Sequence, residues 1–379
     1  MRLLRLRQKN FRNLSSPLFL PGPGLTTIVG GNAQGKTNLL EAIELVLGGE
    51  LRNGLADRIA FGQSEAWLYA EVETQFGSSR LEVKLSREGR EYRLNEAPAS
   101  LRELAGLPGA VLLGPDDLEL VQGPPEERRR FLDLLLSRFS ARYRAMLSHY
   151  SRALQQRNAA LRGSLRGRGV EAVGWADAPA PAGRFPSEQA IARAAMGKSG
   201  SIQAAVGIWN HELVKYGSEI LSLRRRMLSK LAPLAREAYR NLAPGELDLE
   251  LSETTDPERF LQDLEDHLQE DLQRGATGVG PHRDDLIILL SGREAARFAS
   301  QGESRSIALA LRLAQHRLLW QHYEEAPILL IDEWNSELDT RRREALLAYA
   351  QSLPQAILAG LETPGVGAVV RIEAGVWGH

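Results

Sequence analysis

The sequence predicts an α/β protein in which the two ends of the chain form one head and a helical lobe is inserted between them. A strand, a glycine-rich loop and a helix follow one another near the N-terminus, and an apolar strand that ends in two acidic residues lies near the C-terminus. Between them, apolar residues recur at three-to-four spacing, which is typical of helices. We expect the first part of the head at residues 1–115, the helical lobe at 116–275 and the second part of the head at 276–379.

The glycine-rich loop reads Gly-Gly-Asn-Ala-Gln-Gly-Lys-Thr at residues 30–37 and fits the phosphate-binding pattern G-x-x-x-x-G-K-[ST]. An apolar strand at 25–29 precedes the loop, and a helix that ends near Gly48-Gly49 follows it. This order presents backbone N–H groups and the positive end of a helix dipole to a polyphosphate. The alternative is a glycine-rich turn that merely carries a lysine, and the flanking strand and helix argue against it.

Two residues of the loop have expected roles of their own. Lys36 is expected to reach the β- and γ-phosphates of a nucleotide, and the Thr37 hydroxyl to bind Mg²⁺. The full set of expected nucleotide contacts in this stretch is Gly30, Gly31, Asn32, Ala33, Gln34, Gly35, Lys36, Thr37 and Asn38.

A second nucleotide motif is the apolar run at 328–331 that is followed by Asp332 and Glu333. Asp332 is expected to complete the Mg²⁺ shell together with Thr37, because hard cations take oxygen ligands. Glu333 is placed to polarise an attacking water as a general base. The alternative is that two acids merely end a strand, which is disfavoured beside a phosphate-binding loop.

Alternating and apolar runs predict the other strands of the head. The first 29 residues are expected to form a hairpin or two strands around a turn at residues 21–24. Further strands are expected at 66–76, 80–85, 91–94, 110–113, 286–290, 356–359 and 369–372. A helix with the apolar face Ile307, Leu311, Ala314 and Leu318 is expected before the acidic strand, and a polar helix after it.

The lobe is expected to contain a short antiparallel helical arm. Apolar residues keep helical spacing from Phe131 to Leu154 and again from Leu213 to Leu234. The stretch 161–200 is rich in Gly, Ala and Pro and predicts a flexible tip. A strand at 247–251 follows, and Asp256-Pro257 predicts the start of a helix that runs to Leu272.

The composition restricts the class of protein. The apolar runs are too short to span a membrane, and the first seven residues alternate as a strand does rather than forming a signal peptide. With no cysteine, thiol chemistry and disulfides are excluded, so we expect a cytoplasmic protein without a membrane partner. The net charge is −1, so a polyanion must bind at local clusters such as 128–130, 224–226 or 341–343. Each cluster taken alone is more typical of a solvated helix face.

The order of these motifs resembles the ATPase head of the ATP-binding-cassette (ABC) superfamily. In that head, a Ser-x-Gly signature opens a helix whose N-terminus faces the γ-phosphate held by the other subunit. The resemblance implies that Ser300 and Gly302 act in trans on a bound ATP, and that Asp339 lies in a loop at the dimer seam. Ser300 is thereby a catalytic candidate beside Lys36 and Glu333. On local sequence alone, Ser300 is a plain helix N-cap.

Within that superfamily the sequence resembles the RecF family, which are bacterial recombination-repair and replication proteins. The resemblance covers nearly the whole chain except 161–200. It rests on motifs that occur in the order of the family: Asn10–Asn13, Gly30–Glu41, Gly114–Leu118, Gly123-Pro124, Arg128–Asp133, Gly280–Asp285, Phe298–Gly302 and Ser336–Asp339.

The RecF resemblance implies an ATP- and Mg²⁺-dependent DNA-binding protein with weak ATPase activity, in which ATP joins two copies of the chain. Such a homodimer would clamp duplex DNA beside a single-stranded gap and, with RecR and RecO, assist the loading of RecA. Two positions depart from the family pattern, because Glu303 stands where Gln is usual and Glu333-Trp334 replaces a more usual pair. A glutamate at 333 favours real but slow hydrolysis.

Three alternatives share the phosphate-binding loop. The ATPase subunit of a membrane transporter would need a glutamine loop after the strand at 110–113 and a switch histidine after 356–359, and the sequence has neither. A chromosome-structural protein of the SMC type would need much longer coiled-coil arms. A metabolic kinase would leave the signature motif unexplained.

Overall fold

The computed structural model describes residues 1–49, 54–165, 202–335 and 339–378. Contacts divide the chain into two compact units. The first unit contains 1–141, 228–250 and 287–379, and the second contains 142–227 and 251–286. Most of the expected tip at 161–200 and residues 336–338 of one motif lie outside the described residues.

These compact units do not divide where the sequence analysis placed its boundaries. Residues 116–141 and 228–250 belong to the unit that holds both chain ends, and residues 276–286 belong to the helical unit. The physical reason is that apolar faces in these stretches pack onto neighbours distant in sequence, which a change in local composition cannot reveal. The three-part domain organisation stays a prediction.

A six-stranded sheet with a parallel core forms the centre of the first unit, in the order β15-β14-β3-β13-β12-β8. Its strands are β3 (Gly24–Val29), β8 (Ala110–Leu113), β12 (Ile328–Ile331), β13 (Gln355–Gly360), β14 (Ala368–Glu373) and β15 (Val376–Gly378). All neighbours from β14 to β8 are parallel, and only the edge strand β15 is antiparallel. Every residue of β12 and β13 is buried, as expected of strands covered on both faces. The carboxyl ends of these parallel strands therefore meet at one edge.

A second, antiparallel sheet has the order β2-β1-β4-β5-β6-β7. Its strands are β1 (Arg2–Lys9), β2 (Leu18–Phe19), β4 (Glu65–Thr74), β5 (Gly77–Ser86), β6 (Arg90–Leu94) and β7 (Ala97–Ala99). Burial alternates along β4, so one face packs on the core and the other faces solvent. Both arrangements left open for the N-terminus occur in part, because β1 pairs antiparallel with β2, whereas β3 lies in the other sheet.

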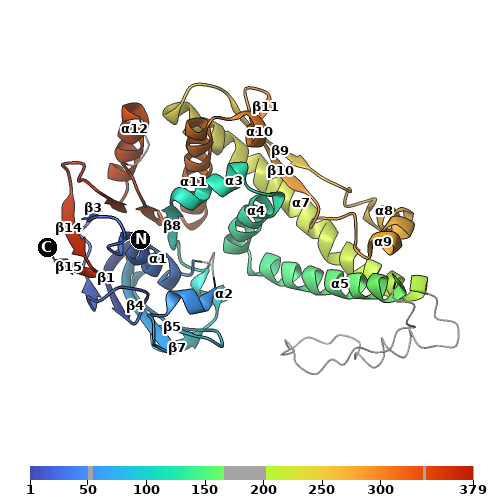
Figure 1. The fold of residues 1–379 in the computed structure, drawn as a ribbon, viewed down its shortest axis with the longest axis horizontal. Helices are drawn as coiled ribbons and strands as arrows, with labels where there is room; N and C mark the ends of the chain where they lie inside the picture. Colours follow the sequence, from blue (N-terminus) through green and yellow to red (C-terminus); the bar gives the residue numbers. More distant parts are fainter. Residues whose placement is uncertain (50–53, 166–201, 336–338, 379) are drawn as a thin grey trace. The chain divides into compact units, whose positions relative to one another are not determined.

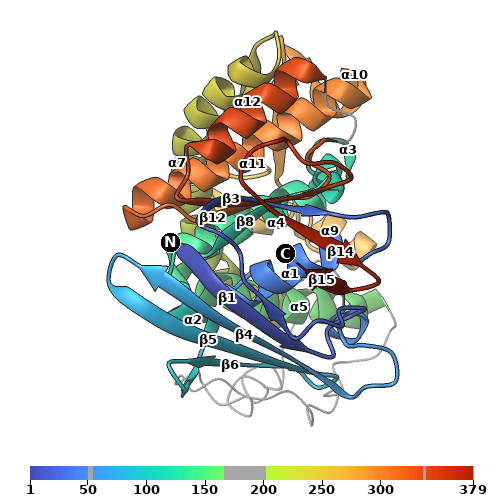
Figure 2. The same ribbon diagram turned by 90° about the vertical axis from the view of Figure 1, so that its left-hand side faces the viewer.

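The helix after the glycine-rich loop, α1 (Lys36–Val46), lies between the two sheets (Figure 2). Leu39, Leu40 and Ile43 are fully buried and share one core with residues of both sheets. The helix ends at Leu47, and Gly48 follows with φ of 83°, which is a conformation that glycine adopts without strain. The predicted end of this helix is confirmed.

Short and long helices complete the first unit. They are η1 (Leu55–Arg58), α2 (Leu101–Leu104), η2 (Pro115–Leu118), α3 (Glu119–Gln122), α4 (Pro125–Phe139), α10 (Ala295–Phe298), α11 (Gln301–Tyr323) and α12 (Thr340–Gln351). The predicted apolar face of α11 is buried. The run expected from 131 to 154 is not one helix, because Ser140 adopts an extended backbone that ends α4.

Helix α11 is held to the rest of the unit by polar side chains along its length. Arg312 donates to the Asp117 carboxylate through Nε at 3.0 Å and Nη2 at 2.8 Å. Four residues further on, His316 lies fully buried, with Nε2 3.0 Å from the Pro327 carbonyl oxygen and Nδ1 2.9 Å from the Tyr349 hydroxyl. A carbonyl oxygen only accepts, so Nε2 carries the proton and Nδ1 accepts from Tyr349. The imidazole thus joins α11 to α12 and to the start of β12.

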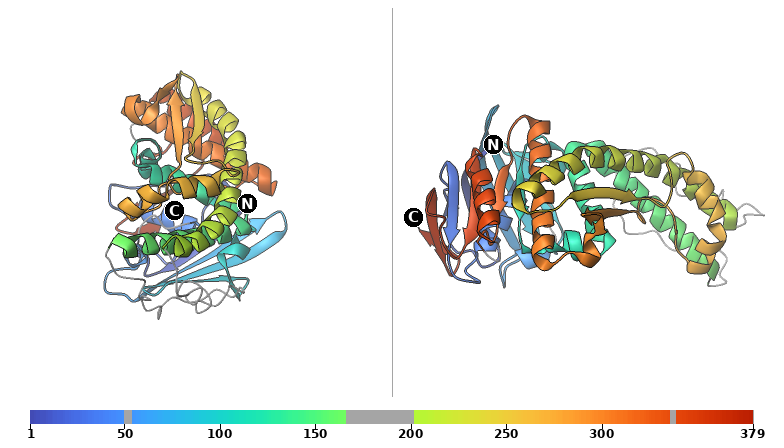
Figure 3. Two further views of the ribbon diagram at one scale, coloured as in Figure 1. Left: turned by 90° about the vertical axis from the view of Figure 1, so that its right-hand side faces the viewer. Right: turned by 90° about the horizontal axis from the view of Figure 1, so that it is seen from above.

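The second unit contains most of α5 (Ala141–Leu165), the first part of α7 (Ile202–Leu242), and the short helices α8 (Phe260–Asp266) and α9 (Leu268–Arg274) (Figure 1). Three cross-helix pairs fix the direction of the two long helices. They are the Arg142–Glu219 ion pair at 2.8 Å, the stacked rings of His149 and Tyr216 at 5.0 Å, and Arg157 Nε to Asn210 Oδ1 at 2.8 Å. Residue numbers rise along α5 as they fall along α7, so the helices are antiparallel, and Figure 3 shows them side by side. The predicted antiparallel arm is confirmed.

The strands β9 (Leu247–Ser252), β10 (Asp285–Leu290) and β11 (Arg293–Glu294) form a small sheet. The helix expected to begin at Asp256 begins only at Phe260 and is interrupted at His267. The Asp256 carboxylate does not cap a helix, because it accepts a hydrogen bond from Arg225 Nη2 at 2.5 Å. The predicted single helix from Asp256 to Leu272 is therefore wrong in its start and its continuity.

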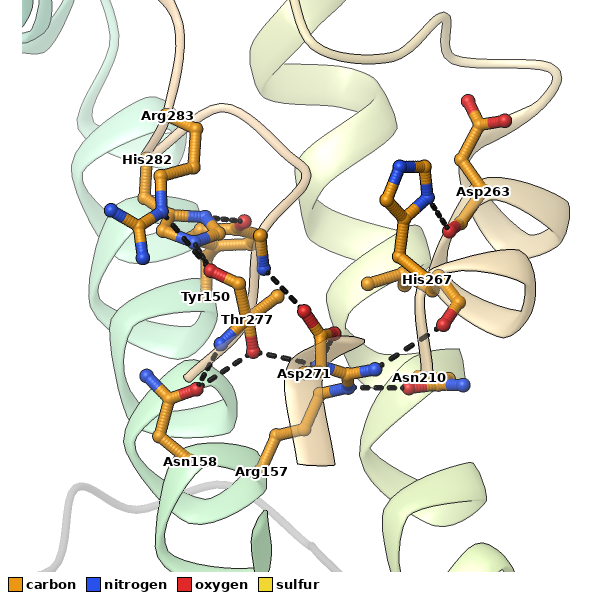
Figure 4. Close-up of polar contacts among 12 residues, drawn as sticks. Tyr150, Arg157, Asn158, Asn210, Asp263, His267, Asp271, Thr277, His282 and Arg283 are labelled. Atoms are coloured by element: carbon orange, nitrogen blue, oxygen red, sulfur yellow. Dashed lines mark hydrogen bonds and ion pairs between the residues drawn. The ribbon is translucent and has the colours of Figure 1, made fainter. Parts of the chain in front are cut away.

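A buried ion pair lies at the centre of the second unit (Figure 4). Arg157 and Asp271 are both fully buried, and Arg157 Nη1 lies 2.6 Å from Asp271 Oδ2. The guanidinium also donates to the Asn210 side chain, to Thr277 Oγ1 and to the Leu264 carbonyl. Helices α5, α7 and α9 and the segment before β10 are thereby joined at one point.

The Gly280–Asp285 segment, one of the motifs of the family resemblance, is built into the same unit. His282 Nδ1 lies 2.7 Å from the Tyr150 hydroxyl, and Arg283 Nε donates to the Thr277 carbonyl at 3.0 Å (Figure 4). Gly280 has φ of 122°, and a Cβ there would lie 2.6 Å from the Tyr150 hydroxyl oxygen. Burial raises the pKa of Tyr150, so its hydroxyl stays protonated. These residues hold the helical unit together.

Removing one partner of the buried pair should unfold this unit readily. Arg157→Met leaves the Asp271 carboxylate buried without its cation, and we expect it to lower the free energy of unfolding by about 3–5 kcal/mol. The double variant Arg157→Met/Asp271→Leu should recover most of that loss. Arg274→Met, which breaks the exposed Arg274–Glu270 pair, should cost less than about 1 kcal/mol. Urea unfolding followed by circular dichroism checks this, and equal midpoints for the two single variants would contradict it.

The buried histidine should make the first unit sensitive to acid. Burial lowers the pKa of His316 to about 4, whereas the unfolded chain titrates near its ordinary value, about 6.5. The unfolded state therefore binds the proton more readily than the folded state. The free energy of unfolding should fall as pH drops from about 6.5 towards 4, and this group should account for about 3 kcal/mol of that loss. His316→Gln should flatten the dependence of the unfolding free energy on pH, and the exposed His211→Gln should not. Parallel pH curves for wild type and His316→Gln would refute the assignment.

Candidate nucleotide-binding site

The carboxyl ends of the parallel strands bring the predicted motifs together. Gly360, at the end of β13, pairs with Val29, at the end of β3, and Leu358 of β13 pairs with Ile331 of β12. The Gly30 N–H then donates to the Gly360 carbonyl at 3.3 Å. Because β13 lies between β3 and β12, the glycine-rich loop and the acid pair stand at the same edge. Ligands of open parallel sheets bind at this kind of edge.

The predicted metal ligands touch. Thr37 Oγ1 lies 2.6 Å from Asp332 Oδ2, although the two residues are 295 positions apart in the chain. Thr37 is the second residue of α1, whose N-cap is Gly35 (φ of 104°), and no side chain caps its first N–H groups. Burial raises the pKa of Asp332, and the hydrogen bond from Thr37 opposes this rise. Two oxygen atoms of the kind that bind metal ions therefore lie next to each other at the uncapped start of α1.

Lys36 lies over the loop and is almost buried. Its Nζ donates to the Gly30 carbonyl at 2.9 Å and to the Gly31 carbonyl at 2.6 Å. Burial lowers the pKa of the ammonium group, and the nearby carboxylates of Asp332 and Glu333 raise it. The cation is thus held by backbone oxygens at the point where the pattern expects it to meet phosphate.

Glu333 has an unusual backbone for a residue with a side chain. Its φ is 50°, its side chain is exposed, and its N–H donates to Asp332 Oδ1 at 3.0 Å. The next residue fixes the turn, because Trp334 N donates to the Ala359 carbonyl at 3.1 Å and its Nε1 to the Glu362 carbonyl at 3.2 Å. Left-handed residues that the surroundings enforce are concentrated at functional sites. The turn directs the Glu333 side chain out of the core, next to the predicted metal ligand Asp332.

A network of polar side chains that was not predicted from the sequence supports the loop. Arg12 Nη1 donates to Asn38 Oδ1 at 2.9 Å, and Asn38 Nδ2 donates to Asn13 Oδ1 at 2.6 Å. Arg12 also pairs with Glu41 at 2.8 Å, and Glu41 pairs with Arg58. The only sequence signal was that the Asn10–Asn13 and Gly30–Glu41 motifs occur together. Their contact could not be read from spacing, because β1 and β3 belong to different sheets.

The turn after β14 contacts Gln34 of the glycine-rich loop. The Gln34 carbonyl accepts from Gly375 N at 2.9 Å, and Gln34 Oε1 accepts from Ala374 N at 2.5 Å, so the turn after β14 supports the loop. Asn32 and Ala33 are exposed at the tip of the loop.

The signature residues are not joined to the loop of their own chain. Ser300 caps α11, where its Oγ accepts from Glu303 N at 3.3 Å and donates to Glu303 Oε2 at 2.7 Å. The hydrogen bonds that the Ser300 hydroxyl and the Ser300 N–H donate to this carboxylate hold the pKa of Glu303 below its ordinary value. Within one chain the N-cap interpretation is therefore correct. In the described ranges, no hydrogen bond or ion pair connects Ser300 or Gly302 with residues 30–37, and their expected action on the nucleotide of another copy stays a prediction.

Gly302 and Asp339 lie on either side of one arginine. A Cβ at Gly302 would lie 3.6 Å from Arg342 Nη1, and Arg342 Nη1 lies 3.1 Å from Asp339 Oδ2. Asp339 also caps α12 by accepting from Arg342 N at 2.9 Å. The two segments predicted to meet at a dimer seam are therefore neighbours within the chain.

These residues fit a nucleotide with a bound divalent cation. The Thr37 hydroxyl and the Asp332 carboxylate are hard oxygen ligands of the kind that Mg²⁺ takes together with phosphate. The uncapped start of α1 and the Lys36 ammonium supply the positive groups that a triphosphate needs.

The first glycine of the loop should be intolerant of a side chain. A Cβ at Gly30 would lie 2.4 Å from the Ile372 carbonyl oxygen, whereas a Cβ at Gly31 would meet nothing closer than 3.7 Å. We expect Gly30→Ala to lower the free energy of unfolding by about 1–3 kcal/mol. Gly31→Ala is the matched control and should change it by less than about 0.5 kcal/mol. Chemical unfolding of both variants tests this, and a Gly31→Ala variant that is the less stable of the two would refute it.

Membrane insertion through a helix finds no support in the part of the chain that the structure covers. None of its described helices combines the length and the apolar character that crossing a bilayer requires.

Comparison with known proteins gives one consistent result. The family model described as the RecF/RecN/SMC N terminal domain matches residues 2–366. The chain is 40% identical over 378 residues to the DNA replication and repair protein RecF of Deinococcus radiodurans, covering 99% of this chain and 95% of that one.

Solved structures agree with the sequence relatives. A structure titled as the recombination mediator protein RecF-ATP in the RecFOR pathway superimposes with a TM-score of 0.83 at 25% identity, covering 99% of this chain and 96% of that one. An Smc head domain from Pyrococcus furiosus, at 18% identity and a TM-score of 0.52, covers 99% of this chain and 94% of that one and shares the fold alone. The predicted ABC-type head fold is confirmed. By its full-length identity to curated relatives and its family model, the chain belongs to the RecF family.

Proposed function

We propose that this protein is an ATP-dependent DNA-binding switch in recombination repair, with weak ATPase activity that resets the switch. ATP joins two copies of the chain, and the dimer binds duplex DNA beside a single-stranded gap. The observation that carries the nucleotide site is the Thr37–Asp332 contact of 2.6 Å at the uncapped start of α1. The titles of the related structures, which name RecF with ATP, support ATP as the nucleotide.

Each residue of the site has a proposed part in binding. The N–H groups of residues 30–38 hold the phosphates, and Lys36 exchanges its bonds to the loop carbonyls for bonds to the β- and γ-phosphates. Thr37 and Asp332 would hold Mg²⁺, which would supply positive charge beside the phosphates. The exposed Glu333 carboxylate accepts a proton from the attacking water.

The partner copy completes the site in this proposal. Ser300 and the N–H groups at the start of α11, including that of Gly302, face the γ-phosphate held by the other chain. To do so, the Ser300 hydroxyl must turn from the Glu303 carboxylate. Asp339, which lies beside Gly302 through Arg342, forms part of the same seam.

DNA binding and partners are proposed from the family. RecF relatives are named as DNA replication and repair proteins, and a related structure is placed in the RecFOR pathway. We therefore propose duplex and gapped DNA, RecO, RecR and RecA as partners, in the cytoplasm. Family membership favours this function over the transporter and chromosome-structural alternatives.

The arginine clusters differ in their availability for DNA. Arg224 is buried and donates to the Pro281 carbonyl at 2.6 Å, and Arg225 pairs with Glu253 and Asp256. Both guanidinium groups therefore already bind groups within the helical unit. Arg7 and Lys9, by contrast, are exposed on the outer face of β1. They are better placed to contact phosphate, where each contact adds to the salt dependence of binding.

Replacing the proposed general base, Glu333, should hold the protein in its ATP-bound dimeric state. Glu333→Gln keeps the shape of the side chain but removes its basicity, so we expect ATP hydrolysis to slow by about 10²–10⁴-fold while ATP still binds. Sedimentation velocity should then show a dimer that persists with ATP and Mg²⁺, and gapped duplex DNA should strengthen it.

Two variants control this measurement. Lys36→Ala should remain monomeric with ATP, because the proposed phosphate contact is lost. Glu88→Gln, at an exposed position of the β5–β6 turn, should behave as wild type. A Glu333→Gln protein that stays monomeric with ATP, Mg²⁺ and DNA would contradict both the base and the switch.

A further inference from the structure

An exposed aromatic side chain stands beside the signature serine. Phe298 is the last residue of α10 and is 65% exposed, two positions before Ser300. The short helix is followed directly by the N-cap of α11, so the backbone between Phe298 and Ser300 is fixed at both ends. Phe298 therefore lies on the surface of its own chain, next to the signature serine.

A second exposed apolar side chain stands beside the phosphate-binding loop. Leu361 follows the last residue of β13 and is 56% exposed. The preceding Gly360 carbonyl accepts from the Gly30 N–H, and Trp334 Nε1 donates to the Glu362 carbonyl just after it. Leu361 is thus held at the sheet edge between the glycine-rich loop and the acid pair.

We propose that, when ATP joins two copies, Phe298 of each chain packs against Leu361 of the other. This contact rests on the proposed function, in which Ser300 of one copy approaches the γ-phosphate held between Thr37 and Asp332 of the second. Two residues span at most about 7 Å, so Phe298 lies within about that distance of Ser300 and must approach the partner together with it. The sheet order places Leu361 at the same edge.

The partner that covers Phe298 and Leu361 is therefore a second copy of this chain. In a two-fold dimer each contact occurs twice, and apolar burial at each seam makes the closed state more stable. Single exposed aromatics are common on protein surfaces, so exposure alone decides nothing. Phe76, which is 90% exposed in the β4–β5 turn of the antiparallel sheet, lies at neither motif and serves as the matched control.

The absence of cysteine from the chain makes a direct test possible. Phe298→Cys and Leu361→Cys are introduced separately into the Glu333→Gln protein, and the two preparations are mixed with a short bis-maleimide. We expect a cross-linked dimer in the mixture with ATP and Mg²⁺, and little without ATP or with either variant alone. A mixture of Phe76→Cys and Leu361→Cys should not cross-link.

The possible results distinguish a failure of the Phe298–Leu361 contact from a failure of the proposed ATP-dependent dimer. If sedimentation shows an ATP-dependent dimer and the Phe298–Leu361 pair does not cross-link, the contact is wrong and the switch stands. If no dimer forms with ATP, the proposed function fails and the contact fails with it.

A second measurement uses no cross-linker. Phe298→Ser should weaken the ATP-dependent dimer about tenfold or more, as truncation of a buried aromatic anchor does. Its nucleotide affinity as a monomer should remain unchanged, because Phe298 does not touch the loop of its own chain in the proposed arrangement. Phe76→Ser should leave both quantities unchanged, and equal dimer affinities for Phe298→Ser and wild type would overturn the proposal.

Discussion

The contact between Thr37 and Asp332 depends on the parallel alignment of the strands that precede them. Strands β3 and β12 come from opposite ends of the chain and are separated in the sheet only by β13. Because all three run in the same direction, the residues that follow them arrive at one edge. The hydroxyl and the carboxylate then meet at 2.6 Å, and the uncapped start of α1 faces the same place. If one strand were reversed, its motif would stand at the opposite edge.

Helix α11 connects this edge to the signature. Its N-terminus carries Ser300, and its middle is bound through Arg312 to Asp117 and through His316 to Pro327 and Tyr349. Pro327 directly precedes β12, so the signature helix and the strand of Asp332 are fixed relative to each other.

The helical unit is stabilised in a different way. Its centre holds a fully buried ion pair, Arg157 with Asp271, whose remaining donors and acceptors are satisfied by neighbouring groups. Removing charges from water costs free energy, and close pairing with full hydrogen bonding offsets it. Around this centre, the His282–Tyr150 bond ties the Gly280–Asp285 segment to α5. The segment is thereby explained as structural support of the helical unit.

The sequence by itself determined the local elements of this protein: the strand, glycine-rich loop and helix around Lys36, the buried strand before Asp332, and the antiparallel helical arm. Each depends on side-chain spacing within a few residues, so its pattern is visible in the chain. Tertiary structure alone decided that β1 leaves the sheet of β3, that Asp256 binds Arg225 instead of capping a helix, and that Arg12 supports Asn38. Each of these contacts joins residues that are far apart in sequence. Such contacts can override local preferences, and they produce no periodic pattern in the sequence.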